Sequence, residues 1–172
     1  DGKIGVFSRP RNEEIRKSYG CESMIGFAVI DSLKELTEDV IENAPYVEGL
    51  FVPDEWGGCN QAYLLESGKV GVIGHISYRN RMDGREISSY MNMSFVLDPM
   101  TRETQDFKII GTRNCYPDGP AKMPNLTDCA FTSGIVMRPD GRADLYSGIG
   151  DCQEGRVVIP YPFEKYGAIV RK

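Results

Sequence analysis

Three side chains that can bind or activate a ligand stand in widely separated segments of the sequence. Arg9 precedes Pro10, which constrains the backbone while the guanidinium stays free for a bidentate contact with a phosphate or with vicinal hydroxyls. His75 is the one histidine of the chain and ends an apolar, glycine-rich run, where its imidazole can donate a hydrogen bond at neutral pH. Asp151 places a carboxylate at the end of a glycine turn. The simpler interpretations are a surface salt bridge, a structural histidine and a turn aspartate that caps its own backbone.

A second group of residues would suit a carbohydrate ligand. Trp56 and Tyr90 offer rings on which the C–H face of a pyranose stacks, and Asp128 offers a carboxylate to its hydroxyl groups. Arg79 and Arg81 add positive charge shortly after His75, which would suit an anion. The alternatives stay open, because Trp56 also suits a packed core and arginines in a charged loop are commonly solvated.

The sequence argues against several other kinds of site and partner. One histidine and scattered cysteines give no zinc-like spacing, and no GxSxG elbow is present, so we expect neither a metal nor a serine nucleophile. The net charge is −5 with both signs interspersed, which leaves no basic stripe for nucleic acid. A run of eighteen apolar residues and a charged leader are both missing, so we expect no membrane partner and no signal peptide.

The five cysteines, an odd number without CxxC spacing, lie mostly in apolar or glycine-bearing segments. They are therefore expected to be buried free thiols of a reducing compartment, and the protein to be cytoplasmic. Disulfides are the alternative, and two sequons that begin at Asn92 and Asn125 would suit secretion.

Turn signals divide the chain at short intervals, which is typical of short antiparallel strands. A glycine follows aspartate or serine at residues 1–2, 67–68, 83–84, 118–119 and 140–141, where a hairpin turn demands positive φ. The expected strands cover residues 3–8, 24–30, 61–66, 69–77, 87–97, 106–111, 130–137, 142–147, 156–159 and 168–171. One short helix is expected over residues 31–43, capped by Ser32, because apolar residues recur there at helical spacing.

A turn glycine followed by an apolar strand recurs near residues 1–8, 67–75 and 140–148. Repetition of one supersecondary unit is typical of a β-propeller, because a single four-stranded blade cannot bury both of its faces. A β-sandwich would produce a similar strand rhythm and remains the alternative.

Three segments resemble glycoside hydrolase family 130, the mannoside phosphorylases and mannosidases built on five-bladed propellers. Residues 1–10 (DGKIGVFSRP) resemble its "dGKyxxxxRP" strand, and residues 57–60 with 67–75 resemble its glycine-rich turn and the strand that ends in histidine. Residues 128–136 with 145–151 are similar to its closing blade, "vFptGav" followed by "lYyGaaD". Residues 89–95 and 161–166 are more closely similar to an uncharacterised bacterial family of five-bladed propellers in the same superfamily.

The resemblance implies a single all-β domain over residues 1–172, which forms the last two and a half to three blades of a five-bladed propeller. The chain would be the C-terminal part of a glycosyl hydrolase-like protein, with the missing blades supplied by the same protein or by another chain. It further implies hydrolysis or phosphorolysis of a mannoside or related oligosaccharide, with inorganic phosphate as the co-substrate in the second case and no other cofactor.

The substrate or phosphate contacts that the resemblance implies are Arg9, His75, Asp151, Asp128, Tyr90 and Trp56. Cleavage of a glycoside also needs an acid that protonates the leaving oxygen. In family 130 that acid lies in an earlier blade, and no segment here matches its surroundings, so we expect the acid outside this chain. A non-catalytic propeller that binds a glycan or a protein partner is the second hypothesis.

Overall fold

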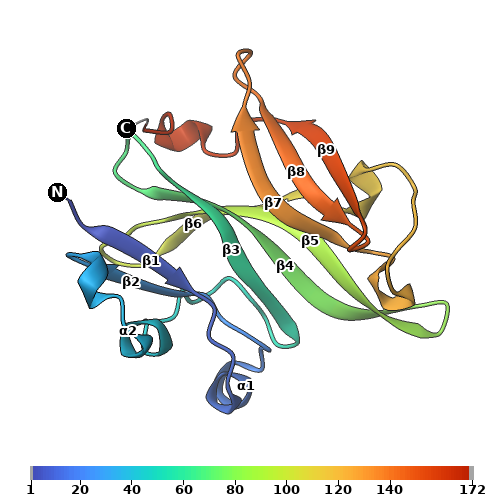
Figure 1. Ribbon diagram of the computed structural model, residues 1–172, viewed down its shortest axis with the longest axis horizontal. Coiled ribbons are helices and arrows are strands. Elements are labelled where there is room, and N and C mark those ends of the chain that lie inside the picture. The colour runs from blue at the N-terminus through green and yellow to red at the C-terminus, as the bar shows by residue number, and fades with distance from the viewer. Residues whose placement is uncertain (1, 171–172) are drawn as a thin grey trace.

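The computed structural model describes residues 2–170, and in it the chain folds into three antiparallel sheets that lie side by side (Figure 1). The β3–β6 sheet stands in the middle, with the β1–β2 sheet on one side and the β7–β9 sheet on the other. The strands are β1 (Ile4–Ser8), β2 (Gly26–Ile30), β3 (Glu55–Leu64), β4 (Val70–Met82), β5 (Arg85–Leu97), β6 (Thr104–Gly111), β7 (Ala130–Met137), β8 (Ala143–Ile149) and β9 (Gln153–Ile159). The all-β character expected from the sequence is confirmed.

Most of the expected strands are present, because glycine turns and apolar runs mark their ends. Gly68 and Gly141 both have φ near +80°, at 79° and 81°, and each lies in the turn before a strand that pairs back onto the preceding one. Strand β3 begins at Glu55 instead of residue 61, and β4 continues to Met82 instead of residue 77. Both extensions lie at the same end of the central sheet, where Glu55 pairs with Tyr78.

Two expectations about the strands and turns are wrong. Residues 168–170 form no strand but only an isolated bridge between Ile169 and Leu65, and Arg171 lies outside the described residues. The predicted turn at residues 118–119 does not have the positive φ of a hairpin turn at Gly119, and it belongs to an irregular loop before β7.

The helix expected over residues 31–43 is broken into two pieces. A 3-10 turn covers Leu33–Glu35, and α2 (Glu38–Glu42) follows with its own N-cap, Thr37, whose hydroxyl accepts from the Val40 amide at 3.4 Å. None of the residues in either piece is buried, so no tertiary packing offsets the cost of a longer helix. The sequence did not lead us to expect α1 (Glu13–Tyr19). Its N-cap is Asn12, whose side-chain oxygen accepts a hydrogen bond from the Ile15 amide.

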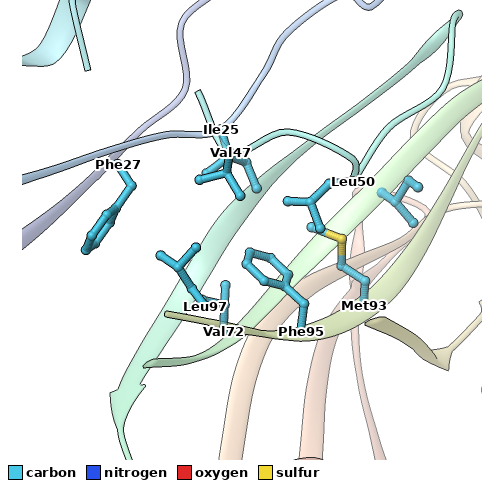
Figure 2. Packing of buried hydrophobic residues seen from close by; sticks show 9 residues of the cluster. Ile25, Phe27, Val47, Leu50, Val72, Met93, Phe95 and Leu97 are labelled. Carbon is cyan, nitrogen blue, oxygen red and sulfur yellow. The ribbon is translucent and has the colours of Figure 1, made fainter. Parts of the chain in front are cut away.

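The apolar core lies on both faces of the central sheet. Figure 2 shows one cluster, to which β5 contributes Met93, Phe95 and Leu97, β2 contributes Phe27, and the loop before β3 contributes Val47 and Leu50. A second cluster on the opposite side joins the central sheet to β7–β9. Its buried members are Leu65, Ile73, Val96, Ile135, Ala143, Leu145, Ile159 and Phe163. The β1–β2 sheet and the β7–β9 sheet therefore pack against opposite faces of the central sheet.

A chain of buried hydrogen bonds also joins the central sheet to the β7–β9 sheet. Asn92 of β5 donates to the Ala130 carbonyl at 3.1 Å and to the Thr132 hydroxyl at 2.8 Å, and it accepts from the Tyr116 hydroxyl at 3.2 Å. Thr132 in turn donates to the Gly74 carbonyl of β4 at 2.6 Å. Because Asn92 is fully buried, all of its polar atoms must be satisfied within the protein. We call these groups the inter-sheet junction.

The cysteines form no disulfide among the described residues. Cys21 and Cys129 are buried and Cys59 is half-buried, as expected, whereas Cys115 and Cys152 are exposed. Burial raises the pKa of Cys59 to about 12 and that of Cys129 to about 11, so both stay protonated thiols at neutral pH. In the described residues, no helix combines the length and the apolar character that crossing a membrane requires.

The inter-sheet junction predicts a large effect of Asn92→Ala on stability. The substitution removes three hydrogen bonds and leaves their partners buried, so the free energy of unfolding should fall by about 3 kcal/mol. Urea denaturation followed by tryptophan fluorescence measures this change. The matched control is Asn80→Ala on the exposed part of β4, which should change the free energy by about 0.5 kcal/mol or less. Equal effects of the two substitutions would contradict the role of the junction.

Candidate functional site

A polar cleft of about 220 Å³ lies where β1, β3, β4 and β5 meet the segments that flank α1. Its lining residues are Arg9, Arg11, Glu22, Ser23, Trp56, Arg79, Ser88 and Tyr90. They come from parts of the chain up to about eighty residues apart, because antiparallel pairing brings the start of β3, the end of β4 and the start of β5 to one end of the central sheet. We call it the arginine cleft.

Three guanidinium groups and one carboxylate dominate the charge of the arginine cleft. Glu22 accepts a hydrogen bond from Arg11 at 2.9 Å and makes a close ion pair with Arg79. Arg9 makes no hydrogen bond or ion pair with any other residue between 2 and 170. The cleft therefore keeps an excess of positive charge, and its most available guanidinium belongs to Arg9.

Two aromatic rings form one wall of the cleft. The Trp56 and Tyr90 rings meet edge to face, with centroids 6.1 Å apart and planes at 81°. Trp56 is 7% exposed, so most of the ring belongs to the core and only its margin borders the cleft. Trp56 is thus mainly a core residue, and its role as a sugar contact stays a prediction.

His75 does not line the arginine cleft but lies buried next to Tyr90. Its ring centroid is 4.4 Å from that of Phe131 in β7 and 6.1 Å from that of Tyr90. Its Nδ1 atom is 2.8 Å from the Asn60 side-chain oxygen, so this nitrogen carries the proton and donates. The Nε2 atom is buried and has no hydrogen-bond partner among the described residues.

Gly58 explains how Arg9 and His75 come close together. A Cβ atom at this position would lie 3.1 Å from Cδ of Arg9 and 3.1 Å from Cε1 of His75. Any larger residue would crowd both side chains. The glycine in β3 therefore leaves the space in which a guanidinium stem and an imidazole edge meet.

Burial and the nearby Arg9 charge together lower the pKa of His75 to about 4. Burial has the larger effect, because transfer from water disfavours the imidazolium, and the guanidinium of Arg9 adds repulsion. His75 is therefore neutral at physiological pH, with Nε2 presented as an acceptor. The sequence led us to expect a donor at this position.

The two expected aspartates stand outside the lining of the cleft. Asp128 accepts from the Ser89 hydroxyl at 2.5 Å, and its carbonyl accepts from the Tyr90 amide at 2.9 Å, so it holds Tyr90 in place. Asp151 is exposed at the turn between β8 and β9, where it pairs with Lys122 at 2.8 Å. Its assignment as a ligand contact stays a prediction.

Sequence reasoning missed part of the lining. Arg11, Glu22, Ser23 and Ser88 carry no recognisable motif, although Arg11 stands two positions beyond the selected Arg9. Arg79 was considered for its charge, whereas its neighbour Arg81 does not line the cleft. In residues 2–170, no group of three or more histidine, cysteine, aspartate or glutamate side chains is arranged to hold a metal ion.

The chain is similar to one protein family and to several solved structures. A family model described as "Protein of unknown function (DUF1861)" matches residues 1–165. No curated protein matches the chain at a significant level.

Three similar solved structures come from Leishmania. A mannose phosphorylase, MPT-4 from Leishmania mexicana in complex with a phosphate ion, is 52% identical to this chain with a TM-score of 0.91. The match covers 99% of this chain and 52% of the phosphorylase. A GDP-Man-dependent mannosyltransferase, MPT-1 from the same organism, is 48% identical with a TM-score of 0.85. The match covers 99% of this chain and 51% of the transferase. A hypothetical protein from Leishmania major is 50% identical with a TM-score of 0.83, with coverage of 99% and 52%. This chain thus spans about half the length of the structures it matches.

The lowered pKa of His75 predicts a loss of stability in mild acid. The unfolded chain binds a proton near pH 6.5 and the folded chain only near pH 4, so stability is complete above pH 6.5 and falls as the pH drops toward 4. The loss reaches its full value of about 3 kcal/mol only below pH 4, where the folded state is protonated as well. Urea denaturation at pH 7 and pH 4.5 should show a smaller loss for His75→Gln, which cannot titrate, than for the wild type. An identical loss in both proteins would contradict the burial of a neutral imidazole.

Proposed function

We propose that this chain, which belongs to the DUF1861 family of proteins of unknown function, forms the phosphate- and sugar-binding side of an enzyme that acts on mannosides by phosphorolysis. Two observations support the proposal. The arginine cleft combines an uncommitted guanidinium with aromatic rings, and a 52% identical structure is a mannose phosphorylase with bound phosphate. Inorganic phosphate is then the co-substrate, and no other cofactor is required.

We further propose that the three sheets are consecutive blades of a five-bladed β-propeller, as the resemblance to family 130 implies. The glycine turns before β1, β4 and β8 have nearly the same positive φ, at 83°, 79° and 81°. Equivalent turns at the start of successive sheets support a repeated blade. The arginine cleft then lies between the first two of these blades, beside the third.

The anion would bind at Arg9, with Arg11 and Arg79 as further positive charges. A guanidinium suits a phosphate because two parallel N–H donors match two phosphate oxygens. Glu22 would orient Arg11 and Arg79, since it contacts both. The four residues give one free cation and two cations held in position, so the phosphate is expected on the side of Arg9.

The sugar would bind against Trp56 and Tyr90, with the buried His75 behind Tyr90. A pyranose stacks through its C–H bonds on an aromatic ring, and its hydroxyls need acceptors as well as donors. The Nε2 atom of His75, buried behind Tyr90 and Phe131, has an unsatisfied lone pair, which a sugar hydroxyl would satisfy, and a phosphate oxygen would not, once this wall moves aside. Hydroxyl recognition is therefore the role that we assign to His75.

In phosphorolysis, a phosphate oxygen attacks the anomeric carbon, the glycosidic C–O bond breaks, and the leaving oxygen takes a proton from an acid. Glu22 is the carboxylate of the arginine cleft, but two guanidinium groups engage it as an acceptor. We assign it no proton transfer. The acid is proposed to lie outside residues 1–172, in agreement with the expectation from the sequence.

The second candidate is a non-catalytic module that binds a glycan or a protein partner. The observation in its favour is that the cleft holds no carboxyl group free of arginine partners. The complete natural protein separates the two candidates when it is incubated with inorganic phosphate and a manno-oligosaccharide. Formation of mannose 1-phosphate supports phosphorolysis, whereas binding without turnover favours the module.

The proposal predicts that Arg9→Ala weakens the binding of inorganic phosphate at least tenfold, which corresponds to about 1.4 kcal/mol. Isothermal titration of the complete protein with phosphate measures the affinity. The control is Arg142→Ala, because Arg142 is also an exposed arginine but pairs with Asp140 in the turn at the far end of β8. The assignment fails if both variants bind phosphate as the wild type does, or if both lose it equally.

A further inference from the structure

Glu22 is held in the arginine cleft by the chain around it. It lies between α1 and β2, where its amide donates to the Glu55 carbonyl at 3.3 Å. Its two neighbours, Cys21 and Ser23, are each 1% exposed, so they anchor the segment in the interior. The Ser23 hydroxyl also donates to the Gly57 carbonyl at 3.5 Å. The place of the Glu22 carboxylate in the lining therefore follows from the fold and not from its arginine partners alone.

The carboxylate is the inner partner of both of its ion pairs. Its Oε2 atom lies 2.9 Å from Nη2 of Arg11, and its Oε1 atom makes the close contact with Nη2 of Arg79. The Glu22 side chain is 21% exposed, whereas the two arginine side chains are each 57% exposed. Each carboxylate oxygen can accept about two hydrogen bonds, and between residues 2 and 170 each receives one, from an arginine. Glu22 therefore keeps acceptor positions for a ligand.

The other polar side chains of the arginine cleft do not distinguish anions by their protons. The arginines and the Trp56 ring nitrogen only donate, and the hydroxyls of Ser88 and Tyr90 can donate or accept. The lining lies wholly within the described part of the chain, and in it Glu22 is the one side chain that accepts hydrogen bonds but cannot donate them. Its contact with an anion therefore depends on whether that anion carries a proton.

A carboxylate in an anion-binding cleft has an electrostatic cost. Two negative groups in contact repel each other, and the repulsion grows where water is excluded. A proton on the ligand reverses the sign of this interaction, because an O–H group donates a charge-assisted hydrogen bond to the carboxylate. Inorganic phosphate keeps at least one proton at neutral pH, whereas sulfate keeps none. Glu22 should therefore attract the first anion and repel the second.

We propose that Glu22 makes the arginine cleft selective for a tetrahedral oxyanion that carries a proton, and that it rejects a fully ionised anion of the same shape. The inference rests on the proposed function, in which phosphate binds in this cleft. The P–OH group donates to Glu22, while other phosphate oxygens accept from Arg9. The cleft measures about 220 Å³, so a phosphate on the side of Arg9 stays near the carboxylate that lines it.

Isothermal titration of the complete natural protein with three anions, at pH 7 and constant ionic strength, tests the proposal. Phosphate and arsenate both carry a proton under these conditions and should bind with similar affinity. Sulfate should bind more weakly by about tenfold or more, because it offers Glu22 no hydrogen. Equal affinities for phosphate and sulfate would overturn this inference and leave the proposed function standing. A failure of phosphate to bind would overturn both.

Glu22→Gln in the complete protein provides the second measurement. The amide has nearly the same shape as the carboxylate, and its NH₂ group can donate to a sulfate oxygen. The affinity for sulfate should therefore rise, and the ratio of phosphate affinity to sulfate affinity should fall by about tenfold. A residue that only orients Arg11 and Arg79 would behave differently, because its loss would weaken the binding of both anions alike. An unchanged ratio is thus the result that contradicts selection by Glu22.

Glu13→Gln is the matched control for this substitution. Glu13 is also a glutamate paired with a cation, since its carboxylate lies 3.2 Å from Nζ of Lys17, but it does not line the arginine cleft. The affinity ratio of this variant should stay at the wild-type value. An equal fall of the ratio in the two variants would indicate a general effect of lost negative charge, and the assignment to Glu22 would then be wrong.

Discussion

The site depends on one physical constraint, which is that the polar groups buried between two sheets must all find partners. Asn92 satisfies this constraint by joining β5 to Ala130 and Thr132 of β7, and Thr132 extends the chain to the Gly74 carbonyl of β4. Such a network is stabilising only when complete, because a partly satisfied network leaves buried donors and acceptors unpaired. It therefore admits one alignment of β7 on the central sheet. That alignment brings the Phe131 ring against His75.

The same alignment determines the electrostatics of the cleft. Phe131 and Tyr90 close off His75 from water, and burial in turn favours its neutral form. Neutrality lets Arg9 stand beside the imidazole at little repulsive cost, in the space that Gly58 leaves open. The cleft can thus hold three guanidinium groups with one carboxylate, because the residue beneath them carries no charge. A protonated histidine at this place would weaken the attachment of every neighbouring cation.

Sequence reasoning found the strands because their determinants are local. A turn glycine with positive φ and an apolar run suffice to place β4 and β8, and both are visible in the sequence. The helix over residues 31–43 failed because helical spacing alone does not stabilise a segment that buries nothing. Arg9 and Tyr90, which line the cleft, were selected by residue type and resemblance. Glu22 was not, because its importance comes from contacts with Arg11 and Arg79 that only the folded chain creates.

Binding an anion and donating a proton need opposite electrostatic surroundings. A cleft with three arginines is suited to hold a ligand anion, but the same arginines make it a poor place for an acid that must keep its proton until the glycosidic bond breaks. An acid with a raised pKa needs surroundings poor in cations, so in the proposed reaction it would approach the sugar from another wall. In the proposed phosphorolysis, the acid therefore belongs to a separate part of the structure that faces this cleft across the ligand.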